Sequence, residues 1–229
     1  MKIARILLIV WAVGLVAAPA WADTIPVNNA GFEAPAMPVT GFVGYIPNWT
    51  TASWLPDSVG VFHPGAGQYL GGIPEGNNVA FTKGPWISQV LTTTLQSGFI
   101  YTLMVDVGYR LDNSSGAFTG YTVALLAGNT VIASTSSGVP SPGGWITAIA
   151  SYNALNSDPL AGQPLQIVLS VNQPYPYQVN FDNVRLDGLD SSAPPPLNPL
   201  TPVAPVPEPG TFALLFTGLA GIVSRKLRR

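Results

Sequence analysis

Alternation of apolar and polar residues, interrupted at short intervals by Gly, Pro, Asn and Ser, limits the fold of this chain more than any other feature. In residues 101–110 the odd positions are all apolar or aromatic, while the even positions include Thr102, Asp106 and Arg110. Residues 165–171 repeat the pattern. A period of two places alternate side chains on opposite faces of a β-strand. No helical periodicity is evident between Asp23 and Asp190, so this part of the chain is predicted to be all-β.

The alternating windows are short and evenly spaced. Strands are predicted over 59–62, 78–81, 87–91, 101–110, 121–126, 130–134, 146–152, 165–171 and 179–186. Many short strands separated by turn residues favour an antiparallel β-sandwich, so residues 23–190 are predicted to form one such domain.

The last predicted strand breaks its own alternation. Val179 and Phe181 share one face, whereas Val184 has the parity of the other face. A β-bulge at Asp182-Asn183 would return all three to the core and turn the Asp182 carboxylate outward. An edge strand with a mixed face would explain the pattern equally well.

Charges are sorted along the chain. Between the two terminal segments only Lys83, Arg110 and Arg185 are basic, against eleven acids in the whole sequence. An acidic exported segment repels phosphate backbones, so no nucleic-acid partner is expected. The absence of cysteine excludes disulfides, thiolate zinc sites and a cysteine nucleophile, and leaves packing, helped by any bound ion, to stabilise the fold.

The N-terminus has the pattern of a secretory signal peptide. Lys2 and Arg5 precede an apolar run from Ile6 to Ala18, and small residues flank the predicted cleavage after Ala22. Residues 1–22 are therefore predicted to be a signal peptide with a helical apolar run. The alternative, an uncleaved anchor, requires a longer apolar run.

Near the C-terminus, residues 191–207 are rich in proline, which favours a semi-rigid linker over a packed element. An uncharged stretch, 211–224, follows and would form a helix of about 21 Å, short against a hydrocarbon core of about 30 Å. A basic tail, 225–229, completes the chain and is expected to stay cytoplasmic. The alternative, a buried C-terminal helix of the domain, leaves the flanking signals unexplained.

Residues 206–229 resemble the PEP-CTERM sorting signal of exopolysaccharide-producing Gram-negative bacteria. The resemblance is carried by Pro207, Glu208, Pro209, Arg225, Lys226, Arg228 and Arg229. It implies an exosortase as a partner, transient anchoring in the inner membrane by a transmembrane helix, and final delivery to the cell surface or the extracellular matrix.

The domain itself is similar to galactose-binding-like jelly rolls found in many carbohydrate-binding modules. The similar segments are 29–33, 46–49, 74–78 and 181–186. In that family an acid near the first strand and an Asp of the last strand bind structural calcium, which nominates Glu33 and Asp182 as metal ligands. Calcium prefers such oxygen ligands.

Catalytic motifs are absent from the sequence. His63 is the only histidine, no Gly-x-Ser-x-Gly elbow occurs, and His63 is expected to end a strand. Trp49 and Tyr175, in predicted loops, are the candidates for stacking on a sugar ring. The absence of these motifs favours a non-catalytic binding or structural module at the cell surface or in the matrix, and the resemblance to the sorting signal implies an association with exopolysaccharide or biofilm. A secreted carbohydrate-active hydrolase is the alternative, and a structural sandwich that self-associates in the matrix is a third.

Overall fold

The computed structural model describes residues 22–52, 55–112, 118–173 and 177–192, and all of its regular elements there are strands. The strands are β1 (Asp23–Ile25), β2 (Phe42–Val43), β3 (Thr50–Ala52), β4 (Val59–Phe62), β5 (Val79–Thr82), β6 (Trp86–Thr94), β7 (Phe99–Tyr109), β8 (Tyr121–Ala127), β9 (Thr130–Thr135), β10 (Gly144–Asn153), β11 (Pro164–Val171) and β12 (Val179–Asp190).

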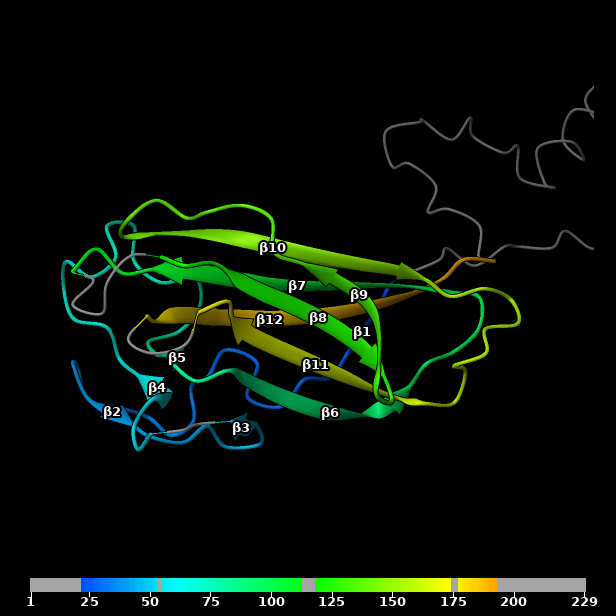
Figure 1. Cartoon of the computed structure of the whole chain (residues 1–229), viewed down its shortest axis with the longest axis horizontal. Coiled ribbons are helices and arrows are strands. Elements are labelled where there is room, and N and C mark those ends of the chain that lie inside the picture. Colours follow the sequence, from blue (N-terminus) through cyan, green and yellow to red (C-terminus); the bar gives the residue numbers. More distant parts are fainter. Residues whose placement is uncertain (1–21, 53–54, 113–117, 174–176, 193–229) are drawn as a thin grey trace, which may run out of the picture. The chain divides into compact units, whose positions relative to one another are not determined.

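Two antiparallel sheets form the domain (Figure 1). The seven-stranded sheet has the order β10-β7-β12-β5-β4-β2, and β1 also pairs with β12. The five-stranded sheet has the order β3-β6-β11-β8-β9. Neighbouring strands are often distant in sequence, as in a jelly roll. The predicted all-β antiparallel sandwich is confirmed.

The core lies between the sheets because the alternating apolar side chains of both sheets face inward. Leu103, Val105 and Val107 of β7 and Leu165, Ile167 and Leu169 of β11 have no exposed surface. All six belong to one cluster of buried residues. Complete burial of each such side chain contributes about 1.5–3 kcal/mol, so the period of two in the sequence is also the main source of stability.

The predicted bulge in β12 is confirmed. The pairing register of β12 against β7 shifts between Asp182 and Arg185, and Asn183 has a φ of 49°. Phe181 and Val184 are consequently both buried. The expected outward turn of the Asp182 carboxylate is confirmed, because Asp182 pairs with Asp106, whose neighbours Val105 and Val107 face the core. Asp182 nevertheless has no exposed surface, because the segment around Glu75 crosses over it and the N–H of Glu75 donates a hydrogen bond to it.

The nine predicted strands all occur, most of them one to four residues longer than predicted. The three additional strands, β1, β2 and β3, have only two or three residues each. The expected signal-peptide and C-terminal helices lie almost entirely outside the described residues. Among the residues that are described, no helix could cross a membrane.

Candidate functional site

Three phenyl rings line up on the outer face of the seven-stranded sheet. Phe42 of β2 pairs with Phe62 of β4, and Phe81 of β5 pairs with Gly60, two residues earlier in β4. Directly opposite residues share a face, so all three rings point away from the core. The ring centroids of Phe42 and Phe62 lie 6.2 Å and 6.0 Å from that of Phe81, both in edge-to-face geometry. The sheet register thus builds an aromatic wall.

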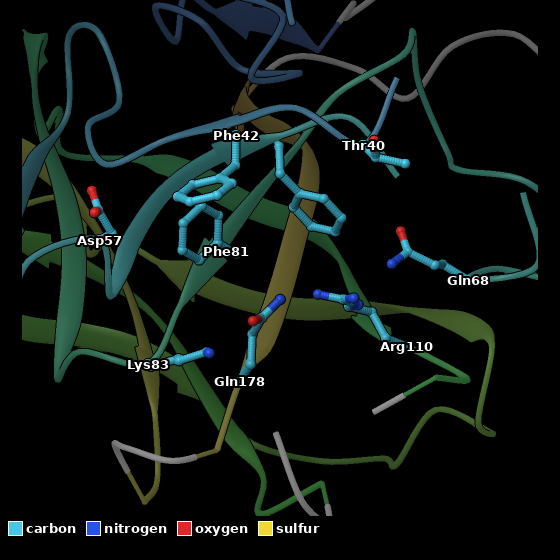
Figure 2. Close-up of a pocket in the computed structure, with 9 residues that line it drawn as sticks. Thr40, Phe42, Asp57, Gln68, Phe81, Lys83, Arg110 and Gln178 are labelled. Atoms are coloured by element: carbon cyan, nitrogen blue, oxygen red, sulfur yellow. The ribbon is translucent and has the colours of Figure 1, made fainter. Parts of the chain in front are cut away.

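The aromatic wall borders a cavity of about 260 Å³. Its polar lining comes from loops and strand ends: Thr40, Asp57, Gln68, Lys83, Arg110 and Gln178. Figure 2 shows the ends of Lys83, Gln178 and Arg110 pointing into the space beside the rings of Phe42 and Phe81. One apolar wall with a few converging polar groups is the usual arrangement of a small-molecule site.

Arg110 is held in place by two neighbours, the carboxylate of Asp112 and the ring of Phe62. Its Nε and Nη2 donate to the two carboxylate oxygens of Asp112 at 2.9 Å and 2.7 Å, and its guanidinium lies 5.1 Å from the centroid of the Phe62 ring. Hydrogen bonds from Arg110 lower the pKa of Asp112 below its ordinary value. Gln68 donates to the same carboxylate at 2.8 Å. The guanidinium is therefore pre-positioned at the cavity.

Lys83 supplies a second positive charge. Burial, followed by repulsion from Arg110, lowers the pKa of its ammonium group. Within the described part of the chain, Lys83 makes no ion pair. The cavity lining carries two cationic side chains and one carboxylate, Asp57. Because Asp112 pairs with Arg110, Lys83 is the cation of the lining that has no ion pair among the described residues.

The loop between β4 and β5 crosses the outer face beside this cavity. Tyr69 donates a 2.8 Å hydrogen bond to Oδ1 of Asn180 on β12, and its ring lies 4.6 Å from that of Trp145 on β10. Burial raises the pKa of the Tyr69 phenol well above its ordinary value. A second hollow of about 390 Å³ is lined by Asp106, Trp145 and Thr147 together with residues of this loop.

Glu33 and Asp182, the predicted metal ligands, contact the same segment, Glu33 from the loop between β1 and β2 and Asp182 from β12. Oε1 of Glu33 accepts hydrogen bonds from the backbone N–H groups of Asn77 and Asn78, at 2.9 Å and 2.8 Å. Oδ2 of Asp182 accepts one from the N–H of Glu75 at 3.0 Å. The pairing of β1 with β12 and the 3.0 Å hydrogen bond from Val184 N to Ala30 O bring the two ends of the domain together.

Several features of this region suit a cation. Burial raises the pKa of Asp182 to about 8, which shows how poorly the surroundings solvate its charged form. Oδ1 of the buried Asn78 has no hydrogen-bond partner. The carboxylates of Glu75 and Glu33 also lie close against the backbone, since a Cβ added at Gly31 would overlap that of Glu75 and a Cβ added at Gly76 would overlap that of Glu33. Nevertheless, the described residues contain no cluster of three or more His, Cys, Asp or Glu side chains that could hold a metal ion.

The structure corrects the expectation for Trp49. This side chain is only 7% exposed: its ring packs 5.3 Å from that of Phe32, and its Nε1 donates to the carbonyl of Asn28 at 3.1 Å. It therefore offers no face to a sugar. Tyr175 and the seven sorting-signal residues lie outside the described residues. His63 directly follows Phe62, the last residue of β4, and its Nδ1 lies 3.1 Å from the carbonyl oxygen of Met37.

Sequence reasoning did not identify the aromatic wall. Phe62 and Phe81 fall in predicted strands, but strand alternation alone does not say which face borders a cavity. The sequence does contain a usable signal. Phe62 and Phe81 lie on the strand face opposite to Val61 and Ala80, and a strand with only one face in the core normally carries polar residues on its other face.

Comparison with known proteins identifies two regions. Residues 23–187 match the HpiC1-like family model, described as HpiC1 cyclase, and residues 205–229 match the PEP-CTERM protein-sorting motif. The predicted sorting signal is confirmed. A search of curated proteins finds no match.

Solved structures of cyclases from Fischerella sp. TAU are similar to this chain. One cyclase is 30% identical, with a TM-score of 0.66 over 75% of this chain and 99% of its own. The Stig cyclase Fisc, in complex with (3Z)-3-(1-methyl-2-pyrrolidinylidene)-3H-indole, is 29% identical, with a TM-score of 0.65 over 73% and 98%. A cyclase in complex with 4-(1H-Indol-3-yl)butan-2-one is 29% identical, with a TM-score of 0.64 over 77% and 100%.

Two consequences follow from these matches. The expectation of a non-catalytic module is not supported, since the similar solved proteins are enzymes. Those chains also consist almost entirely of the matched domain, and the fragment 23–192 contains all of the residues that match the family model.

Proposed function

Because this chain belongs to the HpiC1 cyclase family, we propose that it is an exported protein that binds a compact aromatic ligand in the cavity beside Phe42, Phe62 and Phe81. The observation that carries this proposal is a cavity of about 260 Å³ that is lined by three phenyl rings and two cationic side chains. Aromatic rings favour offset or edge-to-face contact with another ring, so a flat ligand suits the wall.

The polar residues in the cavity lining indicate which functional groups the non-aromatic part of the ligand carries. Lys83 and Arg110 are donors without acceptor capacity, and the amides of Gln68 and Gln178 can donate or accept. Their charge favours a ligand with an acceptor oxygen and disfavours a cationic one. A neutral indole with a carbonyl side chain meets both requirements, and a solved cyclase binds such a molecule, 4-(1H-Indol-3-yl)butan-2-one.

Calorimetric titration of residues 23–192 with this ketone tests the proposal. We expect saturable binding that weakens about 3- to 10-fold in Phe42→Ala, the range that one aromatic contact supplies. Phe42 is 58% exposed, so its loss should leave the fold intact. The control is Trp86→Ala, which removes a partly exposed ring on the other sheet. Equal affinity of the two variants, or no heat with the wild type, contradicts the proposal.

Ring closure of the bound ligand is the second candidate function, favoured by the family. Cyclisation of an unsaturated side chain is an isomerisation that a proton donor can promote, and a donor works best when its pKa approaches the working pH. Lys83, whose pKa is lowered at the cavity, is the donor we propose. An indole with an unsaturated side chain should give a product of unchanged mass and altered NMR spectrum. Lys83→Met should stop that conversion while retaining ligand binding.

An extracellular polysaccharide partner remains a separate proposal, supported by the sorting signal and by the exposed ring of Phe42 in the cavity lining. Specific retention of residues 23–192 on a glycan array would support it. Product release would instead support a carbohydrate-active hydrolase, which requires two carboxylates about the cleaved bond. The cavity lining contributes one, Asp57, which favours a binder.

We also propose that Glu33 and Asp182, with the side-chain oxygen of Asn78, hold a structural calcium ion that ties the two ends of the domain together. Calcium neutralises buried carboxylates and stabilises the state that binds it. The Tm of residues 23–192 should rise with calcium and fall again with a chelator, and Glu33→Gln should abolish the rise. Absence of both binding heat and a Tm change on adding calcium refutes the site.

Delivery by an exosortase follows from the sorting motif. We propose that the exported chain is anchored briefly in the inner membrane and is then moved to the surface. Replacement of Pro207, Glu208 and Pro209 by alanine should trap the full-length chain in the inner-membrane fraction of its host. Normal surface delivery of that variant would contradict this route.

A further inference from the structure

Lys83 is the single lysine between residues 23 and 192, and the fold places it at the cavity beside the aromatic wall. It directly follows β5 and lies two residues beyond Phe81, so its side chain projects from the same face of the sheet as that ring. Figure 2 shows the end of this side chain pointing into the space beside the rings of Phe42 and Phe81. The one ε-amino group of the domain is thus directed at the proposed ligand.

Hydrogen bonds hold the backbone on both sides of Lys83. Its own N–H donates to the carbonyl of Ser58 at 2.6 Å. The hydroxyl of the fully buried Thr82 accepts a 3.0 Å hydrogen bond from the N–H of Gly84. Gly84 also lies against Ala52, since a Cβ added there would lie 2.3 Å from the carbonyl oxygen of Ala52. The amine is therefore attached to a fixed part of the fold, as a reactive group requires.

The surroundings of Lys83 favour its uncharged form. Burial, followed by repulsion from Arg110, lowers the pKa of the ammonium group. Asp112 and Phe62 hold the guanidinium of Arg110 in place, so this repulsion persists. The carboxylate in the lining, Asp57, forms no ion pair with Lys83 among the described residues. A lysine that is partly desolvated beside another cation is activated as a nucleophile, because only the unprotonated amine has a free electron pair.

A carbonyl carbon is the electrophile with which such an amine reacts. Nζ of Lys83 forms a bond to this carbon while the electron pair of the C=O π bond moves to the oxygen, which takes a proton. Loss of water from the resulting carbinolamine leaves an imine. Both hydrogens of the water come from the amine, so the step needs no oxidant, reductant or further reactant. Arg110 has more N–H groups than Asp112 occupies, and these can stabilise the negative oxygen during addition.

From these observations we infer that Lys83 captures an aldehyde or a ketone in the cavity as a reversible imine. The inference rests on the proposed function for the aromatic part of the ligand, which lies against Phe42, Phe62 and Phe81. It adds a covalent bond to the side chain of that ligand. Protonated Lys83 donates to an unsaturated side chain, as proposed above, whereas unprotonated Lys83 binds a carbonyl group. The ligand class is therefore a flat ring with a carbonyl group on a short side chain.

Reductive trapping tests the inference on residues 23–192, the part of the chain that corresponds to the solved cyclases. The protein is incubated with phenylacetaldehyde, or with the indole ketone, and with sodium cyanoborohydride, which reduces an imine to a stable amine. The product gains the mass of the carbonyl compound less one oxygen atom, and peptide mapping separates Lys83 from the N-terminal amine. At about pH 7 trapping at Lys83 should be at least about 5-fold faster than at an exposed lysine, which is almost fully protonated.

The matched control is the double variant Lys83→Met/Asn129→Lys, which moves the lysine to an exposed turn between β8 and β9 on the other sheet. Equal trapping rates at the lysines of the two proteins overturn the inference. A wild type that binds the indole ketone in calorimetry but gives no adduct at Lys83 also overturns it, and leaves the proposed function intact. Fast trapping at Lys83 that is the same for propanal, which has no ring, supports the imine and contradicts the proposed aromatic ligand.

Discussion

Tyr69 reaches across 111 residues of sequence to donate a buried 2.8 Å hydrogen bond to the side-chain oxygen of Asn180. The same Asn180 donates to the carbonyl of Ala80 at 3.1 Å, so one amide connects the β4–β5 loop, β5 and β12. This connection fixes the loop over the outer face of the seven-stranded sheet. The shape of that face therefore depends on a contact that lies outside the main core.

Tyr69→Phe should lower the stability of the domain without altering its fold. The variant loses one buried hydrogen bond, worth about 1 kcal/mol, while Asn180 keeps its bond to Ala80. In a domain of this size the Tm should fall by about 2–4 °C. Thermal denaturation of residues 23–192 measures this change. Tyr45→Phe, at an exposed position, is the control and should leave the Tm unchanged.

Gly60→Ala should damage the ligand cavity through the backbone. A Cβ at this position would lie 1.8 Å from the carbonyl oxygen of Val43, so β2 would have to move away from β4. Phe42, which belongs to β2, would move with it. We expect a loss of about 1–3 kcal/mol in stability and weaker binding of the indole ketone.

The control for this change is Gly71→Ala, where a Cβ would meet no atom within 4 Å. Urea unfolding and calorimetric titration of both variants provide the comparison. If Gly60→Ala binds and unfolds as Gly71→Ala does, the close approach of β2 to β4 does not shape the cavity.

Asp158 should make the domain sensitive to acid. Its Oδ2 accepts a 2.6 Å hydrogen bond from the hydroxyl of Tyr152, and this bond, followed by one from the N–H of Leu160, lowers the pKa of the carboxyl group. A carboxyl group whose pKa is lowered by folding stabilises the folded state above its unfolded pKa, and this contribution disappears as the pH falls through the folded pKa.

Below about pH 4 the Tm of the wild type should therefore fall more steeply than that of Tyr152→Phe, which lacks the bond that contributes most to the lowered pKa. Near pH 7 the wild type should be the more stable protein. Thermal denaturation from pH 2.5 to 7 separates the two profiles, and parallel profiles over that range would exclude this hydrogen bond as a source of the acid sensitivity.

The long strands could be predicted from sequence, and the bulge was one of two explanations that the sequence left open, because each pattern is local. Alternation over 101–110 and 165–171 reports core packing directly, and the parity break between Phe181 and Val184 reports the extra residue. Strands β2 and β3, of two and three residues, are too short to alternate and exist because longer neighbours supply their hydrogen bonds.

The candidate site was much less predictable, because its residues come from six separate segments. Phe42, Gln68 and Gln178 meet only through sheet pairing and loop crossing, neither of which has a local signal. Trp49 shows the opposite error. Trp49 was predicted to lie in a loop and to stack on a sugar ring, yet its ring packs against that of Phe32 and its Nε1 donates to the carbonyl of Asn28.

Asn183 allows the bulge to be tested in detail, because its backbone is left-handed and its side chain makes a hydrogen bond to the neighbouring strand. Its φ of 49° is unfavourable for most residues but tolerated by Asn and Gly. Its Nδ2 also donates a 2.8 Å hydrogen bond to Oδ2 of Asp106 on β7. Asn183→Gly retains the backbone conformation and loses the hydrogen bond, whereas Asn183→Ala loses both.

Urea unfolding should therefore rank the proteins as wild type, Asn183→Gly and Asn183→Ala, from most to least stable. The first step removes a hydrogen bond to a carboxylate, about 1.5–3 kcal/mol, and the second adds about 1 kcal/mol of backbone strain. If the two variants are equally stable, alanine causes no backbone strain at position 183. The hydrogen bond from the Asn183 side chain to Asp106 would then be the only contribution of this residue to the bulge.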